Sequence, residues 1–474
     1  MNDIAPLPNH IPPRTVTRFQ RSDVYRSQVH QAIAGGAHTY SKGDDQFPIR
    51  SPAAIARGRG GRVWDLDGNE YVDCALGLGS VSLGHAYEPV LAAVREQLEQ
   101  GVNFQRPAAI ELELAHALQA AIPGAERVKF AKNGSTVTTA AVKLARAFTG
   151  RDLVAFPFNH PFYSYDDWYI GRGKTASGVP TGTVSMSLTY DSTKPETLAA
   201  LFKQHPGKIA AVITETEELF PAPPENIREV QRLAHADGAL LILDEMVSGF
   251  RSGFPGAYPG LGLSPDLVTW GKGAGNGFSF CALTGRADVM DLGGLKQVGR
   301  PRVFLISTTH GGEAHALAAG LAVLKEYRKH DVLGHHHRLV ARLAASFKAM
   351  IDRHGLSGAI EAHASPWRIV FICRDGKGAV SLGHRTLLMQ EMIGRGVLFQ
   401  GLFLPCFTHD DADMAQVEAA FDASCQVYRL ALEHGYERYL DGEPLRPVFR
   451  RYNGCRQTCP AEPCPHEQTC RSAT

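Results

Sequence analysis

The chain has 474 residues, of which 44% are hydrophobic and 20% charged, which is ordinary for a globular protein with room for two domains. Its formal net charge of +1 excludes the strongly basic surface of a protein that binds nucleic acid or an anionic membrane. No apolar run reaches the roughly 18 residues of a membrane helix. Residues 1–8 lack the pattern of a secretory signal, so a cytoplasmic protein is expected.

In chain order, the sequence first predicts an N-terminal part and then a large domain. Residues 1–85 are expected to form an extended arm, a helix and part of a smaller domain, with a β-hairpin at 62–73. Helical and strand patterns alternate over 86–330, which predicts a large domain on a mainly parallel sheet. Its helices are predicted at 88–100, 110–121, 136–148, 225–237 and 313–328, and its strands at 127–131, 152–156, 210–214, 239–243, 267–270 and 280–285.

The pattern changes after residue 330. Residues 331–445 predict a smaller α+β domain, and residues 446–474 form a tail rich in Cys and Pro. The elements predicted in the smaller domain are a helix at 333–354, strands near 367–373 and 396–400, and a helix at 411–434. The expected fold class is therefore α/β, with a large, mostly parallel sheet domain and a smaller α+β domain.

Two predicted strands deliver a charged side chain at their carboxyl ends. The apolar run 241–243 leads into Asp244, and the run 267–270 is followed by Lys272 among glycines. Ligands of such sheets bind beyond the carboxyl ends of the strands. A lysine and an acid suit pyridoxal 5′-phosphate (PLP), which needs a Schiff-base lysine and an acid that keeps its ring nitrogen protonated. The lysine could also move a proton between substrate carbon and cofactor. The alternative is that Asp244 caps a turn and Lys272 is a solvated charge.

Two loops that follow predicted strands could complete such a site. Residues 132–139 (Lys-Asn-Gly-Ser-Thr-Val-Thr-Thr) open a predicted helix, and N–H groups and hydroxyls at a helix N-terminus bind phosphate well. Alternatively, Ser135 only caps that helix. Residues 158–169 are rich in aromatic rings, which can stack on a flat cofactor or a sugar, or simply pack as a hydrophobic loop.

Taken in order, these motifs resemble those of class III (subgroup II) PLP-dependent aminotransferases of the glutamate-1-semialdehyde aminomutase type. Residues 243–251 (Leu-Asp-Glu-Met-Val-Ser-Gly-Phe-Arg) are similar to the family's L-D-E-V-x-x-G-F-R. Residues 269–278 (Thr-Trp-Gly-Lys-Gly-Ala-Gly-Asn-Gly-Phe) are similar to L-G-K-x-x-G-G-G-F, and residues 144–151 to L-A-R-x-x-T-G-R. The resemblance runs from about residue 35 to about residue 413 and implies PLP fold type I, the fold of aspartate aminotransferase.

The resemblance implies roles for individual residues. Lys272 would hold the cofactor as a Schiff base, and Asp244 would pair with its pyridinium nitrogen. Met246, where the family usually has Val, would pack on one face of the ring. Gly134 and Ser135 would hold the phosphate.

Further residues follow from the same resemblance. Phe162 falls where the family has its stacking Tyr, and Tyr163 falls at the following His, in a stretch with a three-residue insertion. Glu215 matches a glutamate near the cofactor. Thr309 matches a threonine that reaches the phosphate of the neighbouring subunit, which implies a homodimer with shared active sites.

The region expected to bind substrate departs from the aminomutases. Lys42 lies near the position of their carboxylate-binding arginine, and a lysine is a poorer bidentate partner for a carboxylate. The adjacent acids Asp44 and Asp45 favour a cationic or hydroxyl-rich substrate. Residues 38–43 and 309–313 look more like the branch of the family that acts on sugars and aminoglycosides.

The expected enzyme is a transaminase. An amino donor, L-glutamate or L-glutamine, would supply nitrogen to an oxo-sugar, such as the 6′-aldehyde of an aminoglycoside intermediate in antibiotic biosynthesis. The alternatives are a PLP-dependent aminomutase or epimerase acting on a related amino-bearing substrate. A non-catalytic protein that binds a metal or a partner through its cysteines is a rival from another class.

The chain has nine cysteines. Five are scattered through predicted folded segments and are expected to be reduced, mostly buried thiols: Cys74, Cys281, Cys373, Cys406 and Cys425. The other four crowd the tail with His466: Cys455, Cys459, Cys464 and Cys470. Four thiolates could hold zinc or an iron–sulfur cluster. Their spacings match no standard zinc motif, so thiols or local disulfides are favoured and no metal is assigned.

Overall fold

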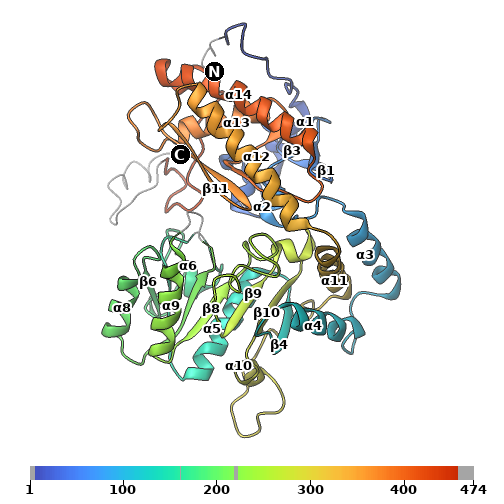
Figure 1. Ribbon diagram of the computed structural model, residues 1–474, viewed down its shortest axis with the longest axis vertical. Helices are drawn as coiled ribbons and strands as arrows, with labels where there is room; N and C mark the ends of the chain where they lie inside the picture. The colour runs from blue at the N-terminus through green and yellow to red at the C-terminus, as the bar shows by residue number, and fades with distance from the viewer. Residues whose placement is uncertain (1–5, 161, 218–221, 457–474) are drawn as a thin grey trace. The chain divides into compact units, whose positions relative to one another are not determined.

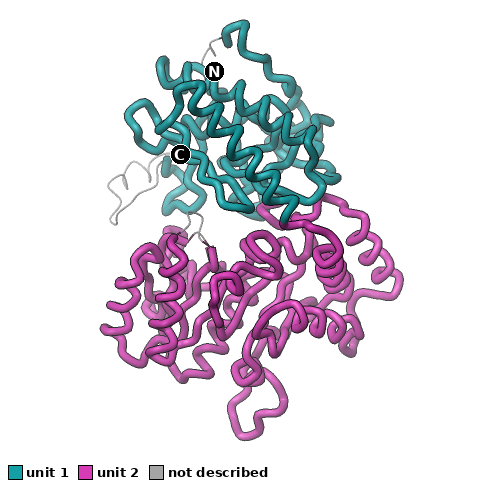
Figure 2. Tube along the Cα trace, viewed as in Figure 1, with its two compact units in different colours: residues 1–76, 334–474 teal, residues 77–333 magenta. Residues whose placement is uncertain are grey.

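The computed structural model describes residues 6–160, 162–217 and 222–456, and Figure 1 shows their helices and strands. The chain divides into two compact units, coloured separately in Figure 2. Unit 1 combines residues 1–76 with residues 334–474, and unit 2 is residues 77–333. The division into units does not test the domain boundaries predicted at residues 85, 330 and 445, which remain predictions.

Unit 2 is built on a seven-stranded sheet with the order β4-β10-β9-β8-β7-β5-β6. The strands are β4 (Arg127–Ala131), β5 (Leu153–Pro157), β6 (Ser187–Tyr190), β7 (Ile209–Glu215), β8 (Leu240–Asp244), β9 (Leu267–Trp270) and β10 (Cys281–Gly285). The pairs from β9 to β6 are parallel, and β10 is antiparallel to both β9 and β4. The predicted mainly parallel sheet is confirmed, with β6 as an additional edge strand.

The central strands explain why the sequence shows continuous apolar runs. All five residues of β8 and all four of β9 are buried. A parallel sheet is covered on both faces, so such strands need apolar side chains at every position rather than at alternate ones. Asp244 at the end of β8 and Lys272 just beyond β9 are therefore charged residues at the edge of an apolar, buried sheet.

Five helices of unit 2 lie within two residues of their predicted bounds: α3 (Glu88–Gln100), α4 (Ala109–Ala121), α5 (Gly134–Thr149), α9 (Pro224–Ala236) and α11 (Ala314–Lys329). The shorter elements are α2 (Leu76–Gly79), α6 (Asp167–Ile170), α7 (Thr181–Val184), α8 (Pro195–Gln204), α10 (Ala287–Met290), η3 (Lys272–Gly275) and η4 (Asp291–Gly293). Helix α5 packs across β4, β7, β8, β9 and β10. It begins after Asn133, whose side chain accepts a hydrogen bond from Thr136 N, and ends before Gly150 in the left-handed conformation.

Unit 1 contains two sheets, one of which combines strands from the N-terminal and C-terminal parts of the chain. Its strands are β1 (Ile55–Arg59), β2 (Arg62–Asp65), β3 (Glu70–Asp73), β11 (Ile360–Ser365), β12 (Arg368–Cys373), β13 (Val397–Leu398) and β14 (Leu402–Phe403). One sheet has the order β1-β2-β3-β13 and the other β11-β12-β14. The predicted hairpin is confirmed by antiparallel pairing of β2 with β3, and β3 pairs in parallel with β13 from the far end of the sequence.

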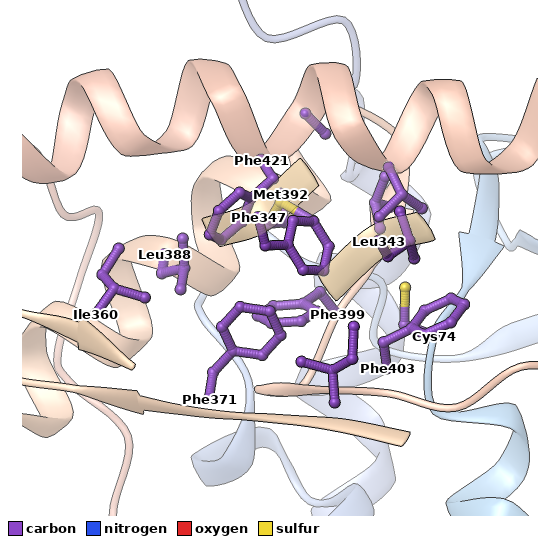
Figure 3. Close-up of a cluster of buried hydrophobic side chains, with 14 of the residues drawn as sticks. Cys74, Leu343, Phe347, Ile360, Phe371, Leu388, Met392, Phe399, Phe403 and Phe421 are labelled. Atoms are coloured by element: carbon purple, nitrogen blue, oxygen red, sulfur yellow. The ribbon is translucent and has the colours of Figure 1, made fainter. Parts of the chain in front are cut away.

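The helices of unit 1 are α1 (Gln20–Ala32), η1 (Tyr40–Lys42), η2 (Asp44–Gln46), α12 (Val332–Arg353), α13 (Leu382–Ile393), α14 (Asp411–His434) and η5 (Tyr436–Arg438). They enclose an aromatic core in which Phe347, Phe371 and Phe421 meet with ring centroids 4.4–5.5 Å apart (Figure 3). Ten of the twelve residues of α13 are buried, so this helix shows no polar face and was not predicted. The strand expected at 396–400 is shorter in the structure, where β13 begins only after Gly396, whose φ of 76° is left-handed, and ends at Leu398.

The five cysteines expected to be buried thiols are all buried and unpaired, as is Cys455. Cys459, Cys464, Cys470 and His466 lie outside the described residues. In the part of the chain that the structure describes, no helix is long and apolar enough to cross a membrane.

Candidate active site

Asp244 is the last residue of β8 and is 3% exposed. Its Oδ1 accepts hydrogen bonds from Met246 N (2.8 Å) and from Thr269 Oγ1 (3.0 Å). Burial raises the pKa of Asp244, and the positive charge of Lys272 opposes that rise. Because both hydrogen bonds end on Oδ1, the carboxylate is held in one orientation with Oδ2 left for another partner.

Lys272 opens η3, directly beyond β9 and Gly271. Its φ of 45° lies in the left-handed region, which costs an ordinary residue roughly 1–2 kcal/mol and is found where the surroundings enforce it, often at functional sites. Burial lowers the pKa of the Lys272 ammonium, while Asp244 and then Glu215 oppose this shift. Lysines become nucleophilic in this way, because the neutral amine is more accessible near neutral pH.

Glu215, Asp244 and Lys272 share the carboxyl edge of the sheet. Glu215 lies opposite Asp244 in the parallel pair β7–β8, and Asp244 lies opposite Thr269 in the pair β8–β9. Lys272 follows Thr269 by three residues. The structure therefore brings together the two acids and the lysine that the sequence singled out.

The N-terminus of α5 meets this edge through Met246. A Cβ added to Gly134, the first residue of α5, would lie 3.1 Å from Met246 Cε. A Cβ added to Gly271 would lie 2.6 Å from Cys281 Sγ and closer still to Met246 Sδ. Met246 thus packs between the start of α5 and the backbone that leads to Lys272, and the lack of a side chain at Gly134 and Gly271 leaves room for it.

Ser135 is buried at the start of α5, and its Oγ accepts a hydrogen bond from Tyr165 N (3.1 Å). The hydroxyl hydrogen of Ser135 and the N–H groups of Gly134 and Ser135 remain as donors, whereas Thr136 N already donates to Asn133 Oδ1. Such donors at a helix N-terminus form an anion site. This end of α5 has the chemistry expected of a phosphate cradle.

The two aromatic residues predicted to contact the cofactor have different environments. Phe162 is 41% exposed, and its ring stands edge-on to Tyr169 at 5.9 Å. Tyr163 is 2% exposed, and its Oη accepts a hydrogen bond from Glu215 N (2.9 Å) and bonds His160 Nδ1. The ring of Phe162 is therefore accessible, whereas Tyr163 is buried and hydrogen-bonded to Glu215, the last residue of β7.

Thr309 lies in the segment that leads into α11 and is exposed. Its carbonyl accepts a hydrogen bond from Asn103 Nδ2 (3.1 Å). The neighbouring Glu313 forms ion pairs with Lys132 and His310. Lys132 directly precedes Asn133, the N-cap of α5, so this ion pair ties the Thr309 segment to the start of α5.

The residues predicted to contact substrate, Lys42, Asp44 and Asp45, lie in unit 1. Lys42 is exposed. Asp44 accepts from Arg26 Nε (3.3 Å) and pairs with His30 Nε2 (3.0 Å), and Asp45 pairs with Arg450 Nη1 (2.5 Å). Since both carboxylates are paired within their own unit, the expectation that they attract a cationic substrate loses its electrostatic basis, and only their hydrogen-bonding capacity remains.

Three residues near the site were not given roles from the sequence. His160, 5% exposed, lies close enough to Asp244 to oppose the rise in the pKa of that carboxyl. Arg251, 1% exposed, lies so close that a Cβ on Gly273 would be 2.8 Å from its Nη1. Asn276 stands where the family motif has Gly. Arg251 and Asn276 belong to the two motifs, residues 243–251 and 269–278, that resemble those of the family, and this position in the sequence could have indicated that they lie near the site.

Among the described residues, no group of three or more His, Cys, Asp or Glu side chains is arranged to hold a metal ion. Three of the four tail cysteines lie outside the described residues.

Comparison with known proteins links this geometry to one family. The profile of the aminotransferase class-III family matches residues 40–359. A glutamate-1-semialdehyde 2,1-aminomutase of Thermus thermophilus is 33% identical over 87% of this chain and 99% of its own length. The protein of the same name from Roseiflexus castenholzii is 34% identical over 84% of this chain and 92% of its own.

Solved structures show the same fold. The PLP internal aldimine form of the Sphingopyxis sp. MTA144 FumI protein superposes with a TM-score of 0.80 at 24% identity, covering 87% of this chain and 98% of that one. The fold similarity agrees with PLP fold type I, as the resemblance of the motifs implied.

Proposed function

The chain belongs to the class-III aminotransferase family, whose members are PLP-dependent enzymes, and we propose that it moves an amino group from an amino acid donor to an oxo-sugar acceptor. The predicted family, enzyme class and cofactor are confirmed at this level. The transaminase chemistry in this proposal is carried by the buried Asp244 at the end of β8, beside Lys272, which follows β9 and has a lowered pKa.

The residues present fit PLP. When bound, the cofactor supplies an electron sink for negative charge on the substrate carbon. Asp244 would keep a proton on the ring nitrogen from its fixed, buried position. Lys272 Nζ would hold the cofactor covalently and then move the proton to or from the substrate carbon. Gly134 and Ser135 would bind the phosphate with the donors of the α5 N-terminus.

The side chains around the ring have complementary proposed roles. Met246 would support one face of the ring, since it already fills the space between Gly134 and Gly271. Phe162 would stack on the other face with its accessible ring. Tyr163 and Glu215, which are joined by the hydrogen bond from Glu215 N to Tyr163 Oη, would lie near the cofactor.

The acceptor class rests on the region around Lys42. An exposed lysine and two acids that are already paired favour a polyhydroxyl compound over a dicarboxylate. We propose an oxo-sugar, such as the 6′-aldehyde of an aminoglycoside intermediate, with L-glutamate or L-glutamine as donor. Residues 38–43 and 309–313 support this choice through their likeness to the sugar-acting branch.

A half-reaction tests the acceptor directly. The protein is loaded with pyridoxamine phosphate and offered a panel of oxo-sugars and oxo-acids, and the return of PLP is followed by absorbance. The proposal expects oxo-sugars to regenerate PLP and Lys272→Ala to be silent with every acceptor. If only oxo-acids regenerate PLP, the sugar assignment is wrong.

The second candidate is an aminomutase, because the relatives that are 33–34% identical carry that name. An aminomutase moves nitrogen within one substrate, and an epimerase inverts an amine-bearing carbon. Neither needs an external amino donor. Turnover that persists after donor amino acids are removed would favour these alternatives over a transaminase.

We also propose a homodimer in the cytoplasm. Thr309 is exposed in its own chain, as expected for a residue that serves a partner. Three large apolar side chains in the preceding segment are strongly exposed: Leu295 (82%), Val298 (95%) and Phe304 (69%). Light scattering should give twice the 51.4 kDa chain mass, and a monomer at micromolar concentration would contradict the shared site. The unpaired buried cysteines suit a reducing compartment.

A further inference from the structure

Asn276 fastens the segment that carries Lys272 to another part of unit 2. Its Oδ1 accepts hydrogen bonds from Ser82 N (3.0 Å) and Leu83 N (2.9 Å), and its Nδ2 donates to Gly84 O (3.1 Å). Two more bonds join the same segments. Ser82 Oγ donates to Gly273 O (3.0 Å), and Gly277 N donates to Ser80 O (2.8 Å). Residues 80–84 are thus bonded to η3 itself, at Gly273, and to the two residues that follow it, Asn276 and Gly277.

These hydrogen bonds are buried and use both the oxygen and the nitrogen of the Asn276 amide. Ser82 and Leu83 are 0% exposed, and Asn276 is 7% exposed. The two acceptor lone pairs and one N–H of the side chain meet backbone groups that need partners away from water. A glycine, which the family motif has at this position, could make none of these three bonds.

The backbone of the same turn adopts a conformation that most residues avoid. Lys272 and Asn276 have φ of 45° and 43°, and Gly277 has φ of 92°. Asn enters the left-handed region more readily than most residues, but lysine has no such preference. The unusual conformation of Lys272 therefore has to be imposed by contacts, and the bonds of Asn276 to residues 82–84 lie four residues away in the same turn.

We propose that Asn276 is a positioning residue for Lys272, and that it fixes the left-handed turn that aims the amine. This inference rests on the proposed function, because it assigns Lys272 to the cofactor. The three side-chain bonds of Asn276 end on the backbone of residues 82–84, so its proposed effect on the cofactor passes through Lys272. Its loss should leave the fold intact but let the Lys272 turn relax toward other conformations.

The test compares Asn276→Gly, which tolerates the left-handed backbone, with Ser82→Ala, which removes the hydrogen bond from Ser82 Oγ to Gly273 O. Asn226→Ala is the control, since it removes the side-chain bonds to Ser192 O and Thr193 O elsewhere in unit 2. In the cofactor-free protein, Asn276→Gly should increase amide hydrogen exchange at least tenfold in residues 80–84 and 272–278. Ser82→Ala should do so to a smaller extent, and Asn226→Ala should not.

With PLP added, Asn276→Gly should shift the pH midpoint of the absorbance of the lysine-bound cofactor and lower kcat of the donor half-reaction about tenfold, with KM nearly unchanged. A merely structural role would lower thermal stability without moving that midpoint. If Asn276→Gly and Ser82→Ala both match Asn226→Ala in exchange and in pH midpoint, the inference is wrong. If the wild type itself shows no lysine-bound cofactor, the proposed function fails, and the inference falls with it.

Discussion

Gly271→Ala probes the closest packing of the site. A Cβ at this position would lie 2.6 Å from Cys281 Sγ and closer still to Met246 Sδ. Gly271 has φ of 176°, an extended conformation open to any residue, so the substitution adds contacts and no backbone strain. Met246 can swing its flexible side chain aside, but Cys281 lies on β10 between β4 and β9 and has little freedom.

The expected cost follows from the overlap. Non-bonded heavy atoms prefer roughly 3.5–4.0 Å, so the new Cβ would overlap each sulfur by about 1 Å. Overpacking of a filled core costs about 1–3 kcal/mol. For a unit of this size, roughly 2–4 °C in Tm correspond to 1 kcal/mol, so a loss of about 4–8 °C is expected for a cost near 2 kcal/mol.

Differential scanning calorimetry and PLP titration measure the two consequences. Gly271→Ala should unfold earlier and bind PLP more weakly, because Met246 is pushed toward the place proposed for the ring. Adding Cys281→Ala should restore part of the stability. Gly260→Ala is the control, since its nearest neighbour would be 3.6 Å away. If Gly271→Ala unfolds within 1 °C of the wild type, or if Gly260→Ala loses as much, the packing argument is refuted.

Three other side chains can be tested by substitution. Asp244→Asn should slow the donor half-reaction about a thousandfold, since a charge pair at about 4 Å and an effective dielectric constant near 20 is worth roughly 4 kcal/mol. The control Asp237→Asn, which weakens the ion pair with Arg151 away from the site, should change the rate less than twofold. Equal rates would contradict the role of Asp244. Glu245 is buried with a pKa raised by burial to about 7, so the folded state binds the proton more tightly than the unfolded state and stability should fall as pH rises from about 4.5 to 7. Glu245→Gln should make the free energy of unfolding, measured by urea titration, depend less on pH over this range. The same pH dependence in the variant and the wild type would contradict the assignment of this effect to Glu245. Phe162→Ala should weaken PLP binding roughly tenfold through loss of stacking, while Phe158→Ala, 63% exposed in the same loop, should not; similar losses would count against the stacking role.

The sequence predicted the part of the fold that has a repeating signal. The buried strands β7, β8 and β9 and the amphipathic helices between them follow from apolar runs and helical periodicity. Helix α13 was not predicted because both of its faces are buried, which leaves no amphipathic pattern. The short edge strand β6 was not predicted because only Ser187 and Tyr190 are buried in it. The antiparallel direction of β10 depends on tertiary pairing and has no local signal.

The candidate site was predicted in the same uneven way. Asp244, Lys272 and Glu215 follow strands directly, so the geometry of a parallel sheet brings them together. The pairing of Asp44 with Arg26 and of Asp45 with Arg450 depends on contacts between distant segments, and it removed the reason to expect a cationic substrate. The bonds of Asn276 to residues 82–84 are separated by about 190 residues in sequence and could be found only in three dimensions.

The covalent binding of PLP by Lys272 can be tested directly. The wild-type protein is mixed with PLP, its visible absorbance is recorded, and borohydride reduction is followed by peptide mass spectrometry. We predict a band of lysine-bound cofactor and a reduced adduct on the peptide containing Lys272, both absent from Lys272→Ala and retained in Lys42→Ala. An adduct on another lysine, or a wild-type protein without the band at saturating PLP, would contradict it.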